Sequence, residues 1–424
     1  MAVAFYFIER LLLFYLFYLY PVFGVNLLMD AFASPCRGLR RRAPRLGAGP
    51  SLKVGILGAG QLGRMLALAG ARLGLRAQFF SPSESGACAG LGHRVVGAWN
   101  DRRLLGPFLF DSDVVTLENE SLDLATVVEL LPEHARLWPS KRTVDWISDK
   151  LVQKRHVLSA GFPVGAFRAC RTVEQALQAA KDLSFPVVLK GRGDGDAGYG
   201  TTWAHDDSQL RAAYGRLAQR GTVLLEAAVP FVRELSVVVV RRADGVDDVY
   251  PVAHTRRTDV RCDVVEIPAP CTSAVAVRAQ TLAREVAAAF GCVGVVAVEM
   301  FELASGELLV NELSSRPHNT GHFTIDACVT SQFENHLRAI LGWSLGETSL
   351  LRPAGVTVNV FGTREGRADK RGAEEALHVS GAVVHMYGHE SVRPGKRMGH
   401  VTVVGDDLDD VRWRAREAAG RIRP

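Results

Sequence analysis

The sequence predicts a mixed α/β and α+β protein with three folded parts, at residues 51–140, 141–350 and 351–424. Three observations support this. A short apolar run near residue 53 ends in a glycine-rich turn that opens a helix, and two more apolar runs continue the alternation of strand and helix. Short apolar strands with short turns fill the middle of the chain. Alternating strands and a final helix close it.

The first part is expected to be an open, doubly wound parallel sheet. The strand-like runs are residues 53–57, 75–80 and 113–117, and the run with helical spacing is residues 64–74. The turn between strand and helix holds Gly58, Gly60 and Gly63, which can bring backbone N–H groups up to a phosphate. The second strand ends at Phe80-Ser81 without the acidic residue that a dinucleotide ribose needs. A phosphate-bearing substrate or a purely structural turn is therefore favoured over nicotinamide binding.

The second and third parts are read from the same patterns. The second part starts with a helix expected from Thr143 to about Ala160. A strand at residues 186–190 then leads into a glycine-rich loop at residues 191–200. The remaining strands of this part are expected at residues 222–225, 235–241, 249–253, 293–301 and 307–313, with a helix over residues 274–290. The third part, a small closing domain, is expected to have strands at residues 356–361, 382–387 and 400–404 before its helix.

Charge excludes one class of function. The 424 residues carry 50 Lys+Arg and 45 Asp+Glu, a formal charge of +5. Residues 1–50 hold six arginines and two acids, which leaves 44 basic and 43 acidic residues in the body. A balanced body has little with which to neutralise a phosphate backbone, so nucleic-acid binding is not expected. The seven cysteines form no Cys-x-x-Cys pair, which favours a reducing compartment and no zinc ribbon.

Residues 1–50 read as a leader outside the fold. Residues 11–29 are uncharged and just long enough to span a bilayer, although Pro21 and Asn26 interrupt them. The arginine-rich, acid-poor segment after Asp30 resembles a transit peptide. A signal followed by a transit segment predicts import into a plastid or another organelle. The alternatives are a membrane anchor through residues 11–29, and a cytoplasmic protein with a wrongly assigned start codon.

A hairpin carries the sharpest chemical signal. If Ser305 and Gly306 form a two-residue turn, Ala304 pairs with Glu307, and Glu299 lies directly opposite Glu312. Two opposed carboxylates on buried strands repel each other unless a positive charge lies between them. A magnesium ion shared with nucleotide phosphates would remove this conflict. The alternatives are a register shifted by one residue, or acids that face solvent.

Two other segments suit a nucleotide. Lys190 ends an apolar strand before the glycine-rich loop, where a cation can reach phosphates beneath a flap. Glu226 ends another strand, and Val229 and Glu234 follow at a spacing that can offer backbone groups to an adenine and a carboxylate to a ribose. A strand-end surface lysine and an ordinary loop are the alternative interpretations.

Two polar clusters favour an anionic substrate. Residues 316–322 place Arg316, His318, Asn319 and His322 directly after the candidate metal strand. Near the C-terminus, Lys396 and Arg397 could hold a monophosphate, although most such basic pairs lie simply on the surface.

In this order the motifs resemble the ATP-grasp ligases, and specifically the 5-(carboxyamino)imidazole ribonucleotide synthetases of purine biosynthesis. The resemblance runs from Lys53 to about Gly405 and is most specific at residues 58–65, 296–301, 311–312, 316–334 and 396–400. It implies a pre-ATP-grasp domain, an ATP-grasp domain and a closing C-terminal domain, with ATP and Mg²⁺ as cofactors. It also implies that ATP phosphorylates bicarbonate. The exocyclic amine of aminoimidazole ribonucleotide then captures the carboxyphosphate or its carbon dioxide, giving ADP and phosphate.

The resemblance also implies a role for each matching residue. ATP would be held by Lys150, Lys190, Glu226, Val229, Glu234, Asn311 and Glu312, and magnesium by Glu299 and Glu312. The ribonucleotide and bicarbonate would contact Gln61, Glu120, Arg316, His318, Asn319, Lys396 and Arg397. The catalytic candidates are Arg316, His318 and Lys190. A homodimer is expected, as is a downstream mutase on a separate chain, because this chain ends at Pro424 soon after the closing domain.

The sequence departs from the family pattern in four places. The glycine loop normally reads Gly-Gly-Tyr-Asp-Gly-Lys-Gly, whereas residues 194–200 read Asp-Gly-Asp-Ala-Gly-Tyr-Gly. The usual nucleotide-binding histidine is Arg257, the lysine after Tyr-Gly is His389, and Glu-Phe-Glu-Asn has become Glu-Asn-Glu-Ser at residues 118–121. A working synthetase is favoured. The alternatives are an ATP-grasp ligase with a different acceptor, and a catalytically weakened, nucleotide-binding regulatory or partner subunit.

Overall fold

The computed structural model describes residues 51–84, 86–120, 122–193, 200–258 and 261–424, all within the unit Leu46–Pro424. The predictions for the leader and for most of the glycine-rich loop therefore fall outside the described residues. Within the described ranges, no helix is both long and apolar enough to cross a bilayer.

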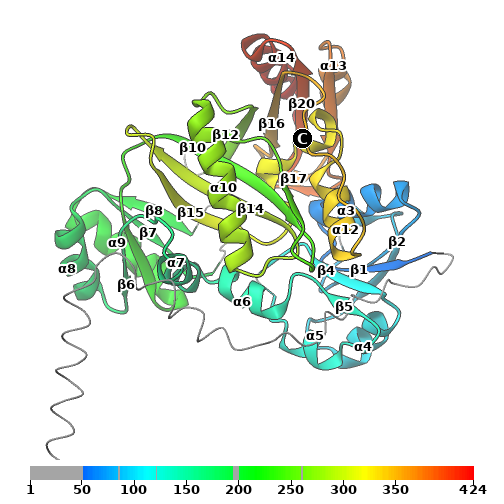
Figure 1. Ribbon diagram of the computed structural model, residues 1–424, viewed down its shortest axis with the longest axis horizontal. Helices are drawn as coiled ribbons and strands as arrows, with labels where there is room; N and C mark the ends of the chain where they lie inside the picture. The colour runs from blue at the N-terminus through cyan, green and yellow to red at the C-terminus, as the bar shows by residue number, and fades with distance from the viewer. Residues whose placement is uncertain (1–50, 85, 121, 194–199, 259–260) are drawn as a thin grey trace, which may run out of the picture. The chain divides into compact units, whose positions relative to one another are not determined.

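The first part is a five-stranded parallel sheet in the order β3-β2-β1-β4-β5, which confirms the predicted doubly wound fold (Figure 1). Side chains of each strand alternate between two cores. Ile56 and Val114 pack in the core that includes α3, whereas Leu57 and Val115 pack with α4 and α5. The elements are β1 (Lys53–Leu57), α3 (Gln61–Arg72), β2 (Arg76–Ser81), β3 (His93–Val96), α4 (Arg102–Phe110), β4 (Val114–Leu117), α5 (Ala125–Leu130) and β5 (Arg136–Leu137).

The single helix predicted from Thr143 to Ala160 is wrong. The chain forms two helices, α6 (Lys141–Ser148) and α7 (Lys150–Ser159), that meet at Asp149. The Asp149 carboxylate accepts hydrogen bonds from the backbone N–H groups of Leu151 and Val152, so it caps α7. This break places Lys150 in the first turn of α7.

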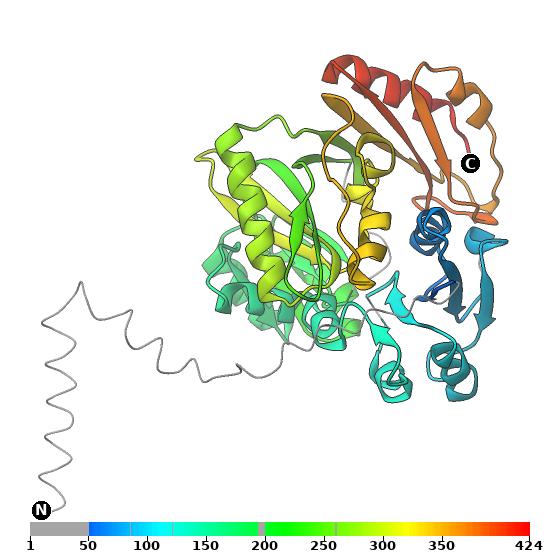
Figure 2. The same ribbon diagram turned by 45° about the vertical axis from the view of Figure 1, so that its right-hand side comes forward.

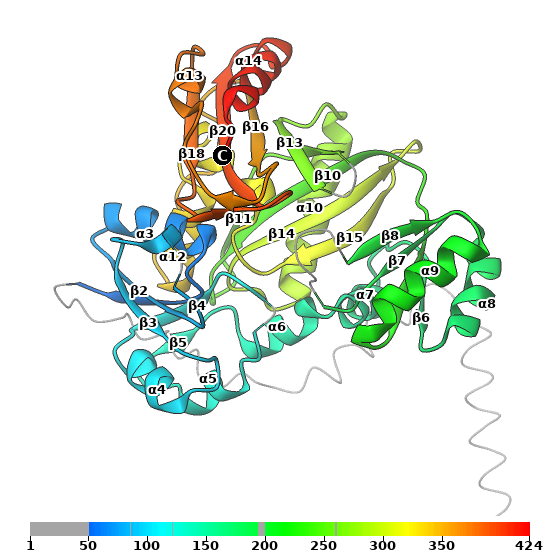
Figure 3. The same ribbon diagram turned by 180° about the vertical axis from the view of Figure 1, so that it is seen from behind.

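A four-stranded antiparallel sheet follows, in the order β6-β9-β7-β8. Helices α8 and α9 pack on it around a core of alanine, leucine and valine side chains (Figure 3). Thr172 and Asp206 cap these helices. The elements are β6 (Phe167–Cys170), α8 (Val173–Leu183), β7 (Val187–Lys190), β8 (Thr201–Ala204), α9 (Asp207–Leu217) and β9 (Val223–Ala227).

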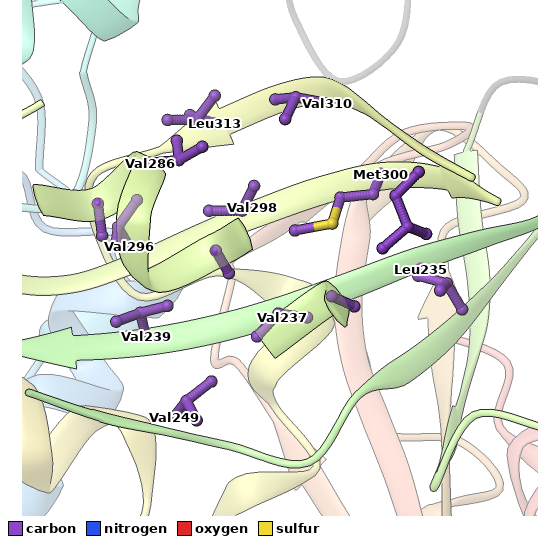
Figure 4. Close-up of a cluster of buried hydrophobic side chains, with 14 of the residues drawn as sticks. Leu235, Val237, Val239, Val249, Val286, Val296, Val298, Met300, Val310 and Leu313 are labelled. Carbon is purple, nitrogen blue, oxygen red and sulfur yellow. The ribbon is translucent and has the colours of Figure 1, made fainter. Parts of the chain in front are cut away.

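A nine-stranded sheet runs β15-β14-β10-β12-β13-β16-β20-β18, with β11 paired to β10. Helix α10 (Ser273–Ala289), which Thr272 caps, packs on β10 and β14, and Figure 4 shows the buried aliphatic side chains between them. The strands of the middle part are β10 (Phe231–Arg241), β11 (Asp247–Val249), β12 (Ala253–Thr258), β13 (Arg261–Ile267), β14 (Gly294–Leu303) and β15 (Leu308–Ser314).

The same sheet continues across residue 350 into the third part. Strand β16 (Ala354–Phe361) pairs with β13, and β20 (Arg397–Gly405) and β18 (Ala382–Met386) follow it. The last helix, α14 (Leu408–Arg421), packs on β16 and β20 (Figure 2). Shorter elements complete this region: η4 (Asn319–Gly321), α11 (Thr324–Ala327), α12 (Gln332–Ile340), β17 (Gly366–Arg367), α13 (Ala373–Leu377) and β19 (Ser391–Val392).

Candidate functional site

The predicted pairing of Glu299 with Glu312 is present, but the predicted turn is wrong. Leu303 rather than Ala304 closes the hairpin, through its N–H group to the carbonyl of Glu307, so the loop has three residues. Gly306 adopts a positive φ of 80°, as the last residue of such loops requires. The three-residue loop alone would shift the strand register by one residue. A bulge between Glu299 and Met300 leaves Asn311 without a register partner on β14 and shifts the register back, so Glu299 pairs with Glu312.

This bulge brings two neighbouring polar side chains to one place. In a regular strand, Asn311 and Glu312 would point to opposite faces of the sheet. Here both line the same cleft, which has a volume of about 600 Å³. A β-bulge can re-aim a side chain in this way. Asn311 and Glu312 therefore both face the cleft, and Glu299 lies opposite Glu312 on β14.

Helix α7 supplies lysine partners to two carboxylates that line the cleft. Lys150 forms an ion pair with Glu312, and Lys154, one turn later on the same face, pairs with Glu226 at 3.3 Å. Gln153 between them hydrogen-bonds the backbone N–H and carbonyl of Leu313, which fixes α7 against β15. Sequence reasoning missed Lys154. Its i, i+4 spacing from Lys150 was the available signal.

Lys190 ends β7 as predicted and faces the same carboxylates. Its Nζ lies 3.0 Å from Glu226 Oε2 and donates to Asn311 Oδ1 at 3.3 Å. Burial opposes ionisation of Glu226, but Lys190 and Lys154 outweigh it, so the pKa of Glu226 is lowered. Burial lowers the pKa of Lys154 to about 8, although Glu226 opposes this change. Glu226 is thus a deeply buried counter-ion for two lysines.

Val229, Glu234 and Arg257 also line the cleft. Arg257, on β12, pairs through Nε with Glu234 and through Nη2 with Glu299 Oε2 at 2.7 Å. Burial would lower the pKa of Arg257, but Glu299 and Glu234 outweigh it and raise the pKa. The guanidinium therefore carries its charge between the predicted ribose and metal carboxylates.

The residues of this cleft fit a magnesium ion. Glu299 and Glu312 are opposed, and the Asn311 amide oxygen adds a third oxygen donor of the kind that Mg²⁺ prefers. Burial raises the pKa of Glu299 despite Arg257. Burial also opposes ionisation of Glu312, but Lys150 and Lys190 outweigh it and lower its pKa. In this structure side-chain cations supply the positive charge that the opposed carboxylates require.

The glycine turn of the first part is occupied by the protein itself. The Glu118 carboxylate accepts hydrogen bonds from the N–H groups of Gly60 and Gly63, both at 2.6 Å. A Cβ atom on Gly58, whose φ is 119°, would lie 2.1 Å from Glu118 Cγ. The glycines therefore admit an internal carboxylate to the start of α3, where a phosphate would otherwise bind, and the structural interpretation of this turn is the better one. Gln61 is the first residue of α3.

Glu120 holds the segment that follows the metal strand. Its buried carboxylate accepts hydrogen bonds from the Ser315 N–H group and hydroxyl and pairs with Arg316 Nε at 3.1 Å. Glu120 therefore fixes the position of Arg316. Direct contact between Glu120 and a substrate stays a prediction.

His318 connects the two polar regions. Its Nδ1 lies 2.9 Å from the Thr320 hydroxyl and 3.8 Å from Glu299 Oε1. Burial and the nearby Arg316 hold the pKa of His318 well below its usual value, so the imidazole is neutral. Asn319 is buried in η4, and His322 stacks on His400 with ring centroids 4.9 Å apart.

Lys396 and Arg397 do not act as one basic group here. Lys396 Nζ donates to the Ser391 carbonyl at 2.8 Å. Arg397 instead lies over the Phe361 ring, 5.9 Å from the ring centroid. Burial lowers the pKa of Arg397, the charge of Arg316 lowers it as well, and the charge of Glu299 raises it. Arg397 therefore belongs with the cluster around Arg316, whereas Lys396 lies on the loop before β20.

A second bulge brings Arg397 to this cluster. Phe361 pairs with Arg397 and Asn359 with His400, so Met398 has no register partner on β16 and Arg397 shares a face with His400. Three buried atoms on this face, Asn359 Oδ1, Arg397 Nε and His400 Nε2, have no hydrogen-bond partner among the described residues. The Tyr387 hydroxyl bonds to His400 Nδ1 at 2.9 Å. Unpaired buried polar atoms are rare and mark a place for water, an ion or a polar ligand.

The chain matches three domain families in succession. These are the ribonucleotide synthetase preATP-grasp domain at residues 52–148, the ATP-grasp domain at residues 155–333, and the phosphoribosylaminoimidazole carboxylase C-terminal domain at residues 355–414. The matches confirm the predicted three-part fold.

Whole-chain similarity agrees with the domain matches. The N5-carboxyaminoimidazole ribonucleotide synthase of Bacillus subtilis is 33% identical, over 85% of this chain and 93% of that protein. The phosphoribosylaminoimidazole carboxylase of Saccharomyces cerevisiae is 35% identical over 88% of this chain, which spans only 66% of that longer protein.

Solved structures share the fold over the same range. N5-carboxyaminoimidazole ribonucleotide synthetase from Thermotoga maritima has a TM-score of 0.79 and 34% identity, over 88% of this chain and 99% of that one. The Aspergillus clavatus N5-carboxyaminoimidazole synthase, in complex with ADP and 5-aminoimidazole ribonucleotide, has a TM-score of 0.79 and 31% identity, over 88% of this chain and 100% of that one.

Proposed function

Because the chain belongs to the N5-carboxyaminoimidazole ribonucleotide synthase family, we propose that it carboxylates the exocyclic amine of aminoimidazole ribonucleotide, using bicarbonate and ATP. One observation carries this proposal beyond the resemblance. Strand β15 leads from Glu312 in the nucleotide cleft to Arg316 in the second polar cluster, and His318 Nδ1 returns to within 3.8 Å of Glu299. A phosphoryl donor and an acceptor would therefore meet at this corner.

The cations of the cleft suit the first half of the reaction. Lys190 and Arg257 line the cleft and Lys150 pairs with Glu312, so together they supply fixed positive charge of the kind that stabilises the transition state of phosphoryl transfer. A magnesium ion held by Glu299 and Glu312 would neutralise further negative charge on the phosphates. Bicarbonate oxygen attacks the γ-phosphorus, and ADP leaves.

The second cluster suits the other half. Arg316 and Arg397 can hold an anion, because guanidinium groups bind carboxylate and phosphate oxygens in pairs. The amine nitrogen forms a bond to the carboxyl carbon, the carbon–oxygen bond to phosphate breaks, and the nitrogen loses a proton. A neutral imidazole such as His318 can accept that proton. The product would then be a substrate for a mutase, which we propose is a separate chain.

Carbon-13 NMR of the reaction with labelled bicarbonate tests this function. The expected result is a carbamate signal on aminoimidazole ribonucleotide that appears with one phosphate per carboxylated amine. A carbamate on another amine only, with none on this ribonucleotide, would favour an ATP-grasp ligase with a different acceptor.

A nucleotide-binding regulatory subunit is the second candidate function. The observation that favours it is the altered glycine loop, in which residues 194–200 lack the lysine of the family pattern. Binding of ADP in a thermal-shift assay, with no turnover under any combination of substrates, would support this second function and contradict the first.

We also propose that residues 1–50 direct the protein to a plastid or another organelle. The support is the order of an apolar segment and an arginine-rich, acid-poor segment. A fusion of residues 1–50 to a fluorescent protein should enter the organelle and lose the leader. Retention at a membrane with the leader intact would favour an anchor, and diffuse cytoplasmic fluorescence would contradict targeting.

A further inference from the structure

We propose that Arg257 is a built-in counter-ion that occupies the metal side of the cleft in the empty protein and is transferred to the nucleotide phosphates when magnesium binds. This inference rests on the proposed function, because it presumes that the cleft takes a nucleotide and a divalent ion. It concerns a position where the chain departs from its family pattern, which has histidine.

The strand geometry sets the position of Arg257. Thr255 of β12 pairs with Glu234 of β10, and Glu234 pairs in turn with Phe301 of β14. Arg257 lies two residues after Thr255, so it points to the same face of the sheet as Glu234 and Glu299. Its fork of donors reaches both carboxylates at once, which the single ammonium of a lysine could not do with the same geometry.

The contact with Glu299 competes with a metal. Arg257 Nη2 donates to Glu299 Oε2 at 2.7 Å, and Lys150 pairs with Glu312. A divalent ion on Glu299 weakens the attraction between this carboxylate and Arg257, because the two cations repel and share one negative charge. Magnesium and Arg257 therefore compete for Glu299.

The displaced guanidinium remains in the nucleotide cleft. Arg257 and Lys190 both line that cleft, as do Arg233, Arg256 and Arg416, so several cations of this chain border the space for phosphates. Arginine binds phosphate oxygens in pairs, and it would lose little by exchanging Glu299 for a polyphosphate. The exchange couples the two ligands. Magnesium frees Arg257 for the nucleotide, and the nucleotide draws Arg257 away from Glu299.

Arg257→Gln tests the exchange, with Arg284→Gln as the matched control. Arg284, on α10, also lies between two carboxylates, with Nε 3.4 Å from Asp247 and Nη2 3.7 Å from Asp248, but it is not part of the cleft lining. Magnesium affinity without nucleotide, and ADP affinity in EDTA, are measured by calorimetry on the full chain. Arg257→Gln should raise the magnesium affinity about tenfold and lower the ADP affinity about tenfold, whereas Arg284→Gln should change each by less than twofold.

The opposite signs separate this role from a structural one, because a damaged cleft would lose affinity for both ligands. Arg257→Lys, which keeps the charge without the fork, should show smaller changes of the same two signs. Unchanged or weaker magnesium binding in Arg257→Gln, with ADP and magnesium still binding the wild-type protein, would overturn the inference alone. A wild-type protein that binds neither ADP nor magnesium would overturn the proposed function as well.

Discussion

The nucleotide cleft and the cluster around Arg316 and Arg397 handle buried charge in different ways. In the cleft, the carboxylates of Glu226 and Glu312 each face lysine, and Glu299 faces Arg257. On the acceptor side, Arg397 Nε and other buried polar atoms have no hydrogen-bond partner among the described residues. The cleft is therefore internally neutralised and must exchange ion pairs to bind a ligand. In the cluster around Arg316 and Arg397, the proposed acceptor side, Asn359 Oδ1, Arg397 Nε and His400 Nε2 stay unpaired within the described part of the chain and are open to a polar ligand.

The largest expected effect comes from breaking the cleft at Glu312. Glu312→Gln removes the partner of Lys150 and one of the two candidate metal carboxylates, so phosphate release should fall by at least about 100-fold. A colorimetric phosphate assay measures this. The control is Glu307→Gln, at the exposed end of the same hairpin, which should keep its rate. Equal rates for the two variants would remove Glu312 from the site.

The buried lysine of the cleft should give a pH-dependent stability. The pKa of Lys154 is lowered to about 8 by burial, so between pH 8 and 10.5 the unfolded chain holds more protons than the folded protein. Stability from this group therefore rises with pH in that window, by about 3 kcal/mol for the whole shift.

Urea unfolding across the alkaline range measures this rise. Lys154→Met should lose the rise, whereas Lys181→Met, on the surface of α8, should keep it. Parallel curves for Lys154→Met and wild type would contradict the assignment.

A substitution in the cluster around Arg316 and Arg397 should change the KM for the ribonucleotide and not the affinity for the nucleotide. Arg397→Gln removes a buried cation that faces Arg316 and His318, and the KM for aminoimidazole ribonucleotide should rise about 10- to 100-fold. ADP affinity should stay within twofold of wild type. Steady-state kinetics measure the KM for the ribonucleotide, and calorimetry measures the ADP affinity. The exposed Arg393→Gln is the control. An equal loss of affinity for ADP and for the ribonucleotide would contradict the assignment of separate ligands to the nucleotide cleft and to the cluster around Arg316 and Arg397.

The smallest expected effect lies at the glycine turn. Glu118→Gln replaces one carboxylate oxygen by an amide N–H that faces a backbone N–H, so stability should fall by about 1–2 kcal/mol. Nucleotide affinity should not change. Chemical denaturation and ADP calorimetry measure both, with Glu133→Gln as the surface control. A loss of nucleotide binding without a loss of stability would indicate that this turn binds a ligand and is not purely structural.

Local patterns predicted the first sheet and most strands, but they missed β6, β8, β12 and β13 and could not supply long-range partners. The strand expected at residues 249–253 is wrong, because residues 250–252 form the connection between β11 and β12. The three-residue turn at Gly306 and the bulge at Asn311 change the hairpin register twice and in opposite senses. The two register changes cancel, so the predicted pairing of Glu299 with Glu312 is correct although the predicted turn is wrong. The partner of the glycine turn is Glu118, more than 50 residues away, and no local pattern at the glycines indicates it.

Two other differences have local causes that the sequence did carry. Asp149 interrupts the predicted long helix because its side chain caps the next one, and an aspartate before Lys150 is an ordinary start signal. Lys154 follows Lys150 at helical spacing, which indicates a shared face. The separation of Lys396 from Arg397 depends instead on the bulge at Met398, which no residue pattern predicted.

Phosphate release with each substrate omitted in turn tests most directly whether the cleft and the acceptor side serve one reaction. We expect phosphate only when ATP with magnesium, bicarbonate and aminoimidazole ribonucleotide are all present, in equal amounts with the ribonucleotide consumed. Phosphate released at the same rate without the ribonucleotide would show that the cluster around Arg316 and Arg397 takes no part in the reaction.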